Sequence, residues 1–391
     1  MQDFQYYTPT KVFFGKHAEA QVGAVLRARG CQKVLLHYGG GSVKASGLLD
    51  RIIASLQEAG IRYVELGGVA PNPKLEEVRH GVQVCREQEA DFILAIGGGS
   101  VIDSAKSIGV STASGFDPWD IITGVVTPEA TVPVGVVLTI SAAGSEMSDS
   151  HVITNEALHL KRGRSLDLIR PTVAFLNPTL TFTVSPFQTG CGIVDIMMHT
   201  MERYFTLDPD TDLTDQLSEG LLRSVIHAGR VAMHHPNDYE ARATLMWASS
   251  LSHNGLTGSG KKYFFTVHKM EHDLSGLFDR IAHGAGLSVL FPAWANYVCL
   301  EYPEKFAQFA VRVMGLPDQG SREELARAGI AALKDYFRSL GMPTTMGELE
   351  IPPESYPQIA DLTTENGTKT VPGFRPLARE DLLAIYRLAE A

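Results

Sequence analysis

The stretch DFILAIGGGSVIDSAK, Asp91 to Lys106, decides how the first half of the chain is expected to fold. It opens with a short apolar run, which is typical of a strand buried on both faces. Three glycines end that run, and the residues from Val101 onward read as a helix. A strand that passes through glycines directly into a helix is half of a β-α-β unit. The stretch therefore predicts a parallel sheet with helices on its faces.

The segments around this stretch repeat the alternation of strand and helix. After about Pro186 only helical patterns follow, so the chain is expected to divide there. We predict a Rossmann-like α/β dinucleotide-binding domain over residues 1–185 and an all-α domain over residues 186–391. Besides the opening stretch, the expected strands of the first domain are Lys33–Gly39, Arg62–Gly68, Pro133–Ile140 and Thr172–Pro178, and its expected helices are Val43–Gly60, Pro73–Ala90 and Val101–Val110.

Composition narrows the class of protein. The chain has 391 residues, a formal net charge of −10 and a pI near 5.7, which argues against non-specific binding to nucleic acid or to anionic membranes. No apolar run is long enough to span a membrane, and the N-terminus does not resemble a signal peptide. The four cysteines form no CxxC pair, as expected of a cytoplasmic protein with reduced thiols.

The glycine turn at the centre of the opening stretch is a candidate phosphate site. Gly97, Gly98 and Gly99 allow close approach of a ligand to the backbone, and Ser100 can cap the next helix. Free N–H groups and the positive end of a helix at one place suit a pyrophosphate. An ordinary tight turn with a helix cap is the alternative, because the turn is not the standard GxGxxG fingerprint.

A second glycine turn follows the strand that begins at Lys33. In YGGGSVK, Gly39, Gly40 and Gly41 are followed by Ser42 and Lys44, and no acidic residue follows the strand. An acidic residue at this place usually binds the ribose diol of NAD, whereas a hydroxyl and an ammonium suit a phosphate. The turn therefore favours NADP over NAD, unless Ser42 and Lys44 are only the solvated start of a helix.

Histidines and an aspartate in the second half suggest a metal site. Asp195 and His199 lie four residues apart in a helical pattern, so both point from one face. His268 and His283 lie 15 residues apart, and one Asp with three His is a ligand set for Fe²⁺ or Zn²⁺. Composition and spacing leave open whether these are ligands or ordinary histidines. Glu202 is likewise either a partner of a ligand or a solvated acid.

Taken in order, these motifs resemble the iron-containing (group III) alcohol dehydrogenase family over nearly the whole chain. The branch that looks most similar is that of butanol dehydrogenases and broad aldehyde reductases. The motifs that carry the resemblance are TPTKVFFG (8–15), PNP (71–73), GGGSVIDSAK (97–106), GSEMS (144–148), GIVDIMMHTME (192–202) and HGAGLSVLFPAW (283–294).

The resemblance implies a cofactor site, a metal site and an assembly. It implies the dehydroquinate synthase-like architecture, a pyrophosphate on the turn 97–100 and a homodimer to which the N-terminal strands contribute. Asp103, Thr139 and Lys161 match positions near the nicotinamide and its ribose, and His272 matches a non-ligand histidine with a proton-relay role. One divalent metal, Fe²⁺ or Zn²⁺, is implied to be held by Asp195, His199, His268 and His283.

Two positions depart from the family pattern. Ala143 stands where a threonine would donate a hydroxyl to the cofactor, and Asn177 stands where many members carry an aspartate before a proline. Both departures bear on cofactor affinity and on the fine geometry of its site. Neither lies among the implied metal ligands.

The expected function is metal-dependent, NAD(P)-linked alcohol dehydrogenation or aldehyde reduction, with direct hydride transfer between nicotinamide C4 and a small alcohol or aldehyde. With NADPH we expect reduction to dominate. A dehydroquinate synthase-like lyase, which would need several Arg and Lys for a phosphate substrate, a glycerol dehydrogenase-like enzyme and a nucleotide-binding regulator remain alternatives. Linear aliphatic substrates are suggested by apolar residues near the expected ligands: Phe264, Phe265, Leu274, Leu277 and Phe278.

Overall fold

A computed structural model of the chain describes residues 1–390. The chain forms two compact units. One comprises Tyr7–Val184 with Ser249–Asn254 and is called the sheet unit below. The other comprises Met1–Tyr6, Ser185–Ala248 and the residues from Gly255 onward, and is called the helical unit.

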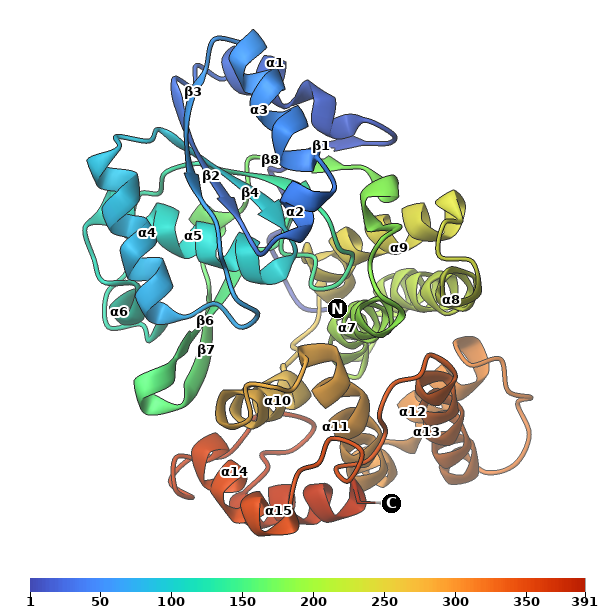
Figure 1. Cartoon of the computed structure of the whole chain (residues 1–391). Coiled ribbons are helices and arrows are strands. Elements are labelled where there is room, and N and C mark those ends of the chain that lie inside the picture. The colour runs from blue at the N-terminus through green and yellow to red at the C-terminus, as the bar shows by residue number, and fades with distance from the viewer. Residues whose placement is uncertain (391) are drawn as a thin grey trace. The chain divides into compact units, whose positions relative to one another are not determined.

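The sheet unit is built on six parallel strands in the order β1-β8-β5-β4-β2-β3 (Figure 1), which confirms the predicted parallel sheet. The stretch Asp91–Lys106 supplies β4, which pairs with β2 on one side and with β5 on the other. The strands are β1 (Lys11–Phe14), β2 (Lys33–Tyr38), β3 (Arg62–Leu66), β4 (Phe92–Gly97), β5 (Val134–Leu138) and β8 (Val173–Leu176).

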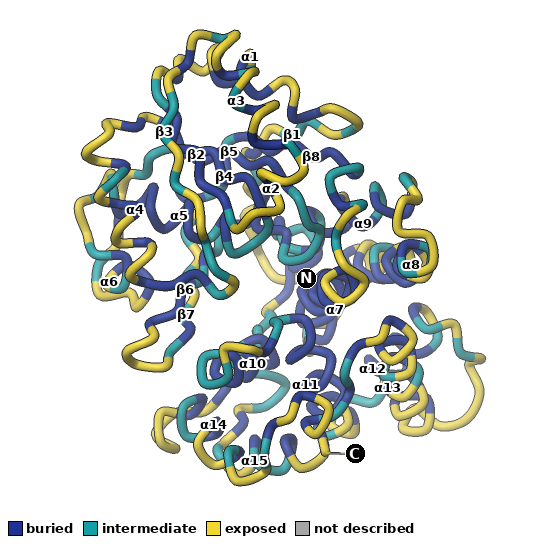
Figure 2. The backbone as a smooth tube through the Cα atoms, in the orientation of Figure 1, coloured by how far each residue is buried: buried dark blue, intermediate teal, exposed yellow. Residues whose placement is uncertain are grey.

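Helices cover both faces of this sheet. Alternate residues of a strand point to opposite faces, and Leu36 and Leu94 belong to the face packed by α1 (Val22–Ala28) and α3 (Leu48–Glu58). On the other face, α5 (Gly99–Ser114) approaches so closely that a Cβ on Gly109 would lie 3.5 Å from Ile93. The helix α4 (Leu75–Glu87) packs beside α5, and α6 (Pro118–Ile122) follows. Figure 2 shows β2, β4 and β5 buried beneath these layers.

The structure differs from the sequence prediction in several elements, one of which is β1, a strand that was not predicted. The helix expected over Val43–Gly60 is broken at Gly47, whose φ of +67° lies in the left-handed region. It therefore forms α2 (Ser42–Ala45) and α3. An antiparallel hairpin of β6 (Ser150–Asn155) and β7 (Leu160–Ser165) was not predicted, because LKRGRS in β7 has no apolar alternation.

The helical unit confirms the prediction for the second half. Among its described residues there is no strand, and one isolated bridge joins Val371 and Leu377. Its core gathers apolar residues of nearly every helix, among them Met197, Leu290 and Phe337. The helices are α7 (Pro186–Tyr204), α8 (Asp212–His234), α9 (Tyr239–His253, which ends in the sheet unit), α10 (Thr266–Leu277), α11 (His283–Val298), α12 (Pro303–Arg312), α13 (Arg322–Ser339), α14 (Tyr356–Thr363) and α15 (Arg379–Leu388).

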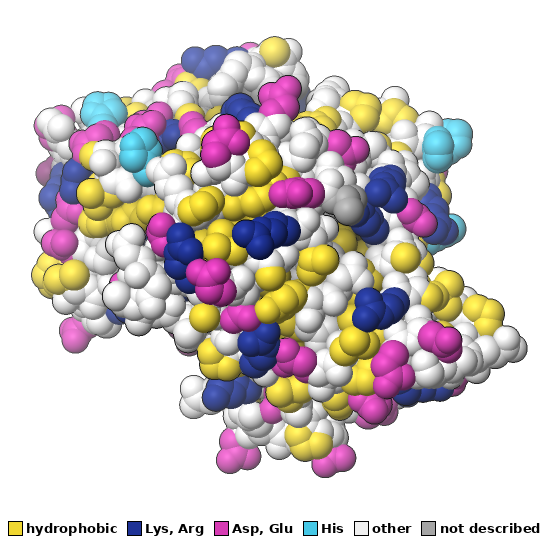
Figure 3. Space-filling model, turned by 90° about the horizontal axis from the view of Figure 1, so that it is seen from below, with side chains coloured by type: hydrophobic (Ala, Val, Ile, Leu, Met, Phe, Trp, Pro, Cys, Tyr) yellow, Lys and Arg dark blue, Asp and Glu magenta, His cyan; other side chains and the backbone are white. Residues whose placement is uncertain are grey.

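The surface carries both signs of charge. On the face seen in Figure 3, acidic and basic side chains are interspersed among polar and apolar ones. In the part of the chain that the structure describes, no helix is long and apolar enough to cross a membrane. The charge of this face is therefore balanced locally.

Candidate metal and cofactor sites

The candidate metal ligands come from three helices of the helical unit: α7, α10 and α11 (Figure 1). α7 has a defined start, because the Ser185 hydroxyl accepts a hydrogen bond from the backbone N–H of Gln188 at 3.2 Å and Pro186 occupies the first turn. From that start, Asp195 and His199 lie one turn apart and are both buried. Nδ1 of His199 lies 3.0 Å from Oδ1 of Asp195, so the predicted shared face is confirmed.

His283 is the first residue of α11, and two glycines behind it allow that helix to come close. A Cβ on Gly284 would lie 2.3 Å from the backbone oxygen of Cys191 in α7. A Cβ on Gly286 would lie 2.7 Å from Cγ of Glu271 in α10. A larger residue at either position would push α11 away, so the HGAG segment fixes where the His283 ring lies.

Oδ1 of Asp195 lies close to a ring nitrogen of each of the three histidines. Oδ1 of Asp195 lies 3.6 Å from Nε2 of His268 and 3.8 Å from Nε2 of His283. Nδ1 of His199 hydrogen-bonds the backbone oxygen of Asp195 at 2.9 Å, which leaves its Nε2 lone pair for a metal. Donors placed tetrahedrally at about 2.0–2.1 Å from an ion lie about 3.4 Å from one another. The spacing of the Asp195, His268 and His283 atoms is close to that value.

Two atoms of this group are buried without a hydrogen-bond partner among residues 1–390: Oδ1 of Asp195 and Nε2 of His268. Leaving a buried polar atom unsatisfied costs about 1–3 kcal/mol. An ion bound by both atoms would remove that cost. One carboxylate with three imidazoles is a ligand set that Fe²⁺ and Zn²⁺ accept, so the residues fit a divalent metal.

Glu202 holds His268 in place. Its carboxylate accepts hydrogen bonds from the backbone N–H of Val267 at 2.6 Å and of His268 at 3.3 Å, and it also contacts Nδ1 of the His268 ring. The same carboxylate therefore caps the N-terminus of α10 and turns Nε2 of His268 toward Asp195. The sequence left the role of Glu202 open, and the structure shows it as a buried partner of a candidate ligand.

Glu271 has the corresponding position beside His283, and the sequence analysis missed it. Its buried carboxylate contacts Nδ1 of His283, so Nε2 of that ring is directed toward Asp195. The signal in the sequence was an acid three residues after His268 in HKMEH. Its burial against α11, which makes it a partner of His283 instead of a solvated acid, depends on tertiary packing.

The carboxylates and imidazoles of this group shift one another's pKa. Burial by itself lowers the pKa of His268, but Glu202 and Asp195 beside it raise that pKa to about 9. Burial by itself raises the pKa of Asp195, but the His199 and His268 imidazoles hold that pKa well below its usual range. The Asp195 carboxylate is therefore ionised, as a ligand of a cation must be, and positive charge is favoured at the His268 position.

His272 lies beside the candidate ligands. Its ring centroid is 5.5 Å from that of His283 and 6.4 Å from that of His268. One of its ring nitrogens belongs with Glu271 and His283 to a group whose ligand atoms lie within 4.8 Å of one another. The ring is half-buried, so it has both a neighbouring ligand and access to solvent, as a proton carrier requires.

In the sheet unit, the turn after β4 leads directly into α5. The helix begins at Gly99 and its N-cap residue is Gly98, with no side-chain cap. The prediction that Ser100 caps this helix is therefore wrong, because Ser100 already lies in the first turn. A Cβ on Gly98 would lie 2.2 Å from the Ile140 side chain, so close packing requires this glycine. The uncapped N–H groups of the first turn suit an anion.

The turn after β2 is open. A Cβ on Gly40 or Gly41 would meet nothing within 4 Å, so a ligand can approach the backbone here. Gly39 is less open, since its Cβ would contact the backbone oxygen of Val69 at 3.6 Å. Ser42 and Lys44 are exposed on α2, the short helix that follows.

An acidic side chain nevertheless lies beside this turn. Glu65 comes from the neighbouring strand β3, accepts a hydrogen bond from the Tyr38 hydroxyl at 2.7 Å and lies 3.9 Å from the ammonium of Lys44. Glu65 does not directly follow β2 in the sequence, so the pattern after that strand does not reveal it. Parallel pairing of β2 with β3 brings the two strand ends together.

The loop after β5 is held by a buried lysine of α5. Nζ of Lys106 donates to the Ser145 hydroxyl at 2.9 Å and to the backbone oxygens of Ser148 and Ser150 at 3.0 and 2.8 Å. Burial lowers the pKa of Lys106 to about 8 despite the nearby Asp103 carboxylate. Asp103 also accepts a hydrogen bond from the Ser145 hydroxyl at 2.5 Å, so both residues fix the same loop.

Two further candidate cofactor residues lie in the same unit. Thr139 donates its backbone N–H to Gly97 at 3.1 Å, which places it beside the glycine turn. Lys161 is buried on β7, and its charge acts on Asp103. Thr139 thus adjoins the turn, and Lys161 lies near the aspartate of α5.

The structure shows the surroundings of the two residues that depart from the family pattern, Asn177 and Ala143. The amide of Asn177 donates to the buried Glu19 carboxylate at 2.9 Å. An aspartate at 177 would face Glu19 with a like charge, so asparagine suits this environment. Ala143 faces the glycine turn, with its Cβ 3.3 Å from the position of a Cβ on Gly99. No hydroxyl is available from residue 143 at that place.

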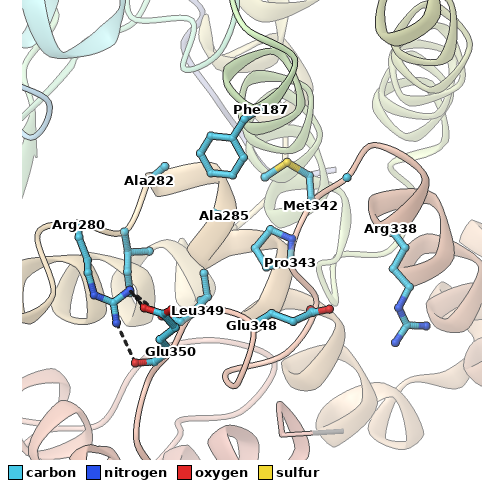
Figure 4. A pocket seen from close by; sticks show the side chains of 12 residues that line it. Phe187, Arg280, Ala282, Ala285, Arg338, Met342, Pro343, Glu348, Leu349 and Glu350 are labelled. Atoms are coloured by element: carbon cyan, nitrogen blue, oxygen red, sulfur yellow. Dashed lines mark hydrogen bonds and ion pairs between the residues drawn. The ribbon is translucent and has the colours of Figure 1, made fainter.

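A cavity of about 660 Å³ also lies in the helical unit, between the start of α7 and residues 338–350 (Figure 4). Its charged groups bind the protein itself. Arg280 donates to the backbone oxygens of Leu349 and Glu350 at 2.8 Å, and Glu348 accepts the backbone N–H of Thr344 at 2.6 Å. None of the four candidate ligands lines this cavity, and we assign no ligand to it.

The chain matches known proteins over nearly its whole length. Residues 9–178 match the family model described as iron-containing alcohol dehydrogenase, and residues 189–389 match that of the Fe-containing alcohol dehydrogenase family, C-terminal. NADH-dependent butanol dehydrogenase A of Clostridium acetobutylicum is 40% identical over 388 residues, which cover 99% of each chain. The NADPH-dependent aldehyde reductase YqhD of Escherichia coli is 35% identical, with 94% of each chain covered.

A solved structure gives the same result. The crystal structure of NADH-dependent butanol dehydrogenase A from Thermotoga maritima superimposes with a TM-score of 0.96 at 36% identity. The match covers 100% of this chain and 99% of that one. The sequence comparison and the structural comparison therefore match the chain to the same family of proteins.

The contacts of Glu202 generate a prediction about metal affinity. Glu202→Gln keeps the size of the side chain but removes the charge that orients His268, so we expect Zn²⁺ to bind about 10–100-fold more weakly. Competition with a chromophoric chelator measures this affinity. Glu19→Gln, which changes a buried carboxylate of the sheet unit, is the control. Wild-type affinity in a folded Glu202→Gln variant would refute the role given to Glu202.

Proposed function

Because the chain belongs to the iron-containing alcohol dehydrogenase family, we propose that it reduces short aliphatic aldehydes with NADPH at a single divalent-metal site. It is a metal-dependent, NAD(P)-linked alcohol dehydrogenase or aldehyde reductase. We place the division of roles near residue 185. Residues before it bind the cofactor, and Asp195, His199, His268 and His283 after it hold the metal.

The convergence of the Asp195, His268 and His283 donor atoms is the observation that carries this proposal. A buried carboxylate surrounded by imidazoles, two of which have a second carboxylate on their Nδ1 atoms, is costly as a structural element alone. A bound cation accounts for all of these groups together. We take Fe²⁺ as the native ion and Zn²⁺ as an alternative, since both accept this ligand set and Zn²⁺ binds more tightly in general.

The chemistry divides between bound groups and the chain. When bound, the metal polarises the substrate oxygen and the nicotinamide supplies the hydride. The chain itself orients both reactants, and His272 delivers a proton to the alkoxide oxygen from a position beside the ligands. Asp103, Thr139 and Lys161 hold the nicotinamide end of the cofactor, while the turn 97–100 binds its pyrophosphate.

Metal dependence is the first test. Protein purified without oxygen and loaded with Fe²⁺ or Zn²⁺ is expected to oxidise NADPH in the presence of butanal, followed by loss of absorbance. His268→Ala is expected to lower kcat/KM by about a thousandfold, because polarisation of the oxygen is worth several kcal/mol. Bound metal without any NADPH or NADH oxidation, over several aldehydes, would point to the lyase or the regulator. The relatives described above are oxidoreductases.

The preference for NADPH rests on Ser42 and Lys44 beside the open backbone of Gly40 and Gly41. The 2′-phosphate of NADP needs donors and positive charge, and Lys44 supplies both. Glu65 opposes this preference, since its carboxylate lies 3.9 Å from the Lys44 ammonium and can accept a ribose hydroxyl. The named relatives include NADH-dependent and NADPH-dependent enzymes, so NADH is the second candidate cofactor.

Two substitutions separate these contributions. Lys44→Ala is expected to raise the KM for NADPH about tenfold, because a charge-assisted hydrogen bond is lost, and to leave the KM for NADH nearly unchanged. Glu65→Gln is expected to act in the opposite sense by lowering the KM for NADPH. Initial rates with both cofactors give these ratios. An equal effect of Lys44→Ala on the two cofactors would contradict the phosphate contact.

Assembly and location complete the proposal. We propose a homodimer formed through the N-terminal strand, because β1 pairs with β8 on one side only and several large apolar side chains near it are exposed. A molar mass near twice 42.5 kDa by light scattering is expected, and a mass of one chain at micromolar concentration would contradict it. The four buried, free cysteines support a cytoplasmic location.

A further inference from the structure

One aromatic residue, Phe265, packs directly against candidate metal ligands. The sequence suggested five apolar side chains near the metal. In the structure Leu274 is fully buried in the core, and Leu277 and Phe278 pack against that core. Phe264 lies against the ammonium of Lys262 at 5.7 Å. The fifth, Phe265, contacts the imidazole rings of two candidate metal ligands, His199 and His268.

The Phe265 ring meets two candidate ligands edge to face. Its centroid is 5.9 Å from that of His199, with an interplanar angle of 66°, and 5.2 Å from that of His268, with an angle of 77°. Phe265 is the N-cap residue of α10, so its backbone is tied to the helix that carries His268. Phe265 is half-buried, so it is not enclosed in the apolar core as Leu274 is.

A buried arginine, Arg203, packs against this ring. The guanidinium carbon of Arg203 lies 4.6 Å from the Phe265 centroid and 5.1 Å from that of Tyr263. One guanidinium nitrogen donates to the backbone oxygen of His199 at 2.7 Å. Arg203 is 3% exposed, and a cation–π contact is strongest when the cation is desolvated in this way. Arg203 therefore ties the Phe265 ring to α7, the helix of Asp195 and His199.

We propose that Phe265 forms the wall of the substrate site next to the metal and limits the bulk of the aldehyde beside its carbonyl carbon, with Arg203 as the residue that positions the ring. This inference rests on the proposed metal site. A carbonyl oxygen bound among the four ligands must direct its carbon chain past the neighbouring rings. Phe265 covers two of those ligands, so it contacts the first carbons of the chain and excludes branching there.

The test compares an unbranched with a branched substrate. Butanal and 2,2-dimethylpropanal differ in bulk at the carbon next to the carbonyl. We expect wild-type enzyme to favour butanal in kcat/KM, and Phe265→Ala to change the ratio by at least about tenfold toward the branched aldehyde, since a methylene in an apolar pocket is worth about tenfold or more. Phe264→Ala, its neighbour, is the matched control and is expected to keep the wild-type ratio.

A binding measurement gives a second readout. Butanamide and 2,2-dimethylpropanamide are unreactive analogues of the two aldehydes, and calorimetry gives their dissociation constants in the presence of cofactor. The same shift in preference is expected for Phe265→Ala, with metal content unchanged. If Phe265→Ala does not fold, Phe265→Leu takes its place, with a smaller shift in the same direction. Unchanged ratios in both readouts, in a metal-loaded variant, would overturn the proposal.

Arg203 is tested by rescue. Arg203→Met is expected to relax the preference for butanal in the same direction as Phe265→Ala, because the ring loses its anchor, while Arg203→Lys restores much of it through a second cation. The positioning role would be overturned if both Arg203 variants lost the preference for butanal while Phe265→Ala kept it. Failure of wild-type enzyme to reduce any aldehyde would instead defeat the proposed reaction, so the two failures are distinguishable.

Discussion

The geometry of the candidate metal site depends first on one carboxylate. Glu202 of α7 accepts the backbone N–H groups of Val267 and His268 and contacts the His268 ring, so a single group caps α10 and orients its ligand. The position of a helix and the direction of a donor atom are thereby fixed together. Glu271 of α10 contacts the His283 ring at the start of α11 and orients that side chain. Three helices are linked by groups that also determine the chemistry, which explains why polar residues are buried in an otherwise apolar core.

The sheet unit meets a different requirement, which is to let a ligand approach its backbone. The turns after β4 and β2 do so with glycines, one required by close packing and the others facing open space. Around them Lys106, Asp103 and Ser145 hold a neighbouring loop by buried hydrogen bonds. Rigid surroundings and an uncapped helix start together form a surface that suits a dinucleotide.

Sequence reasoning reached the parallel sheet, the helical second half and the shared face of Asp195 and His199, because each follows from local periodicity. It did not reach the hairpin β6–β7, whose residues lack alternation, or the break at Gly47, which depends on a left-handed backbone. Glu65 and Glu271 were missed for another reason. Each acts through a neighbour that is distant in sequence, and only strand pairing or helix packing brings the two together.

The position of the bound metal is the most direct measurement to make. Crystals of the Fe²⁺- or Zn²⁺-loaded protein, measured at the absorption edge of the ion, give an anomalous map. We expect one strong peak within about 2.0–2.2 Å of an Asp195 carboxylate oxygen and of Nε2 atoms of His199, His268 and His283. A peak placed instead among Glu271, His272 and His283, the neighbouring group of possible ligands, would contradict the central claim. So would the absence of a peak from fully active crystals.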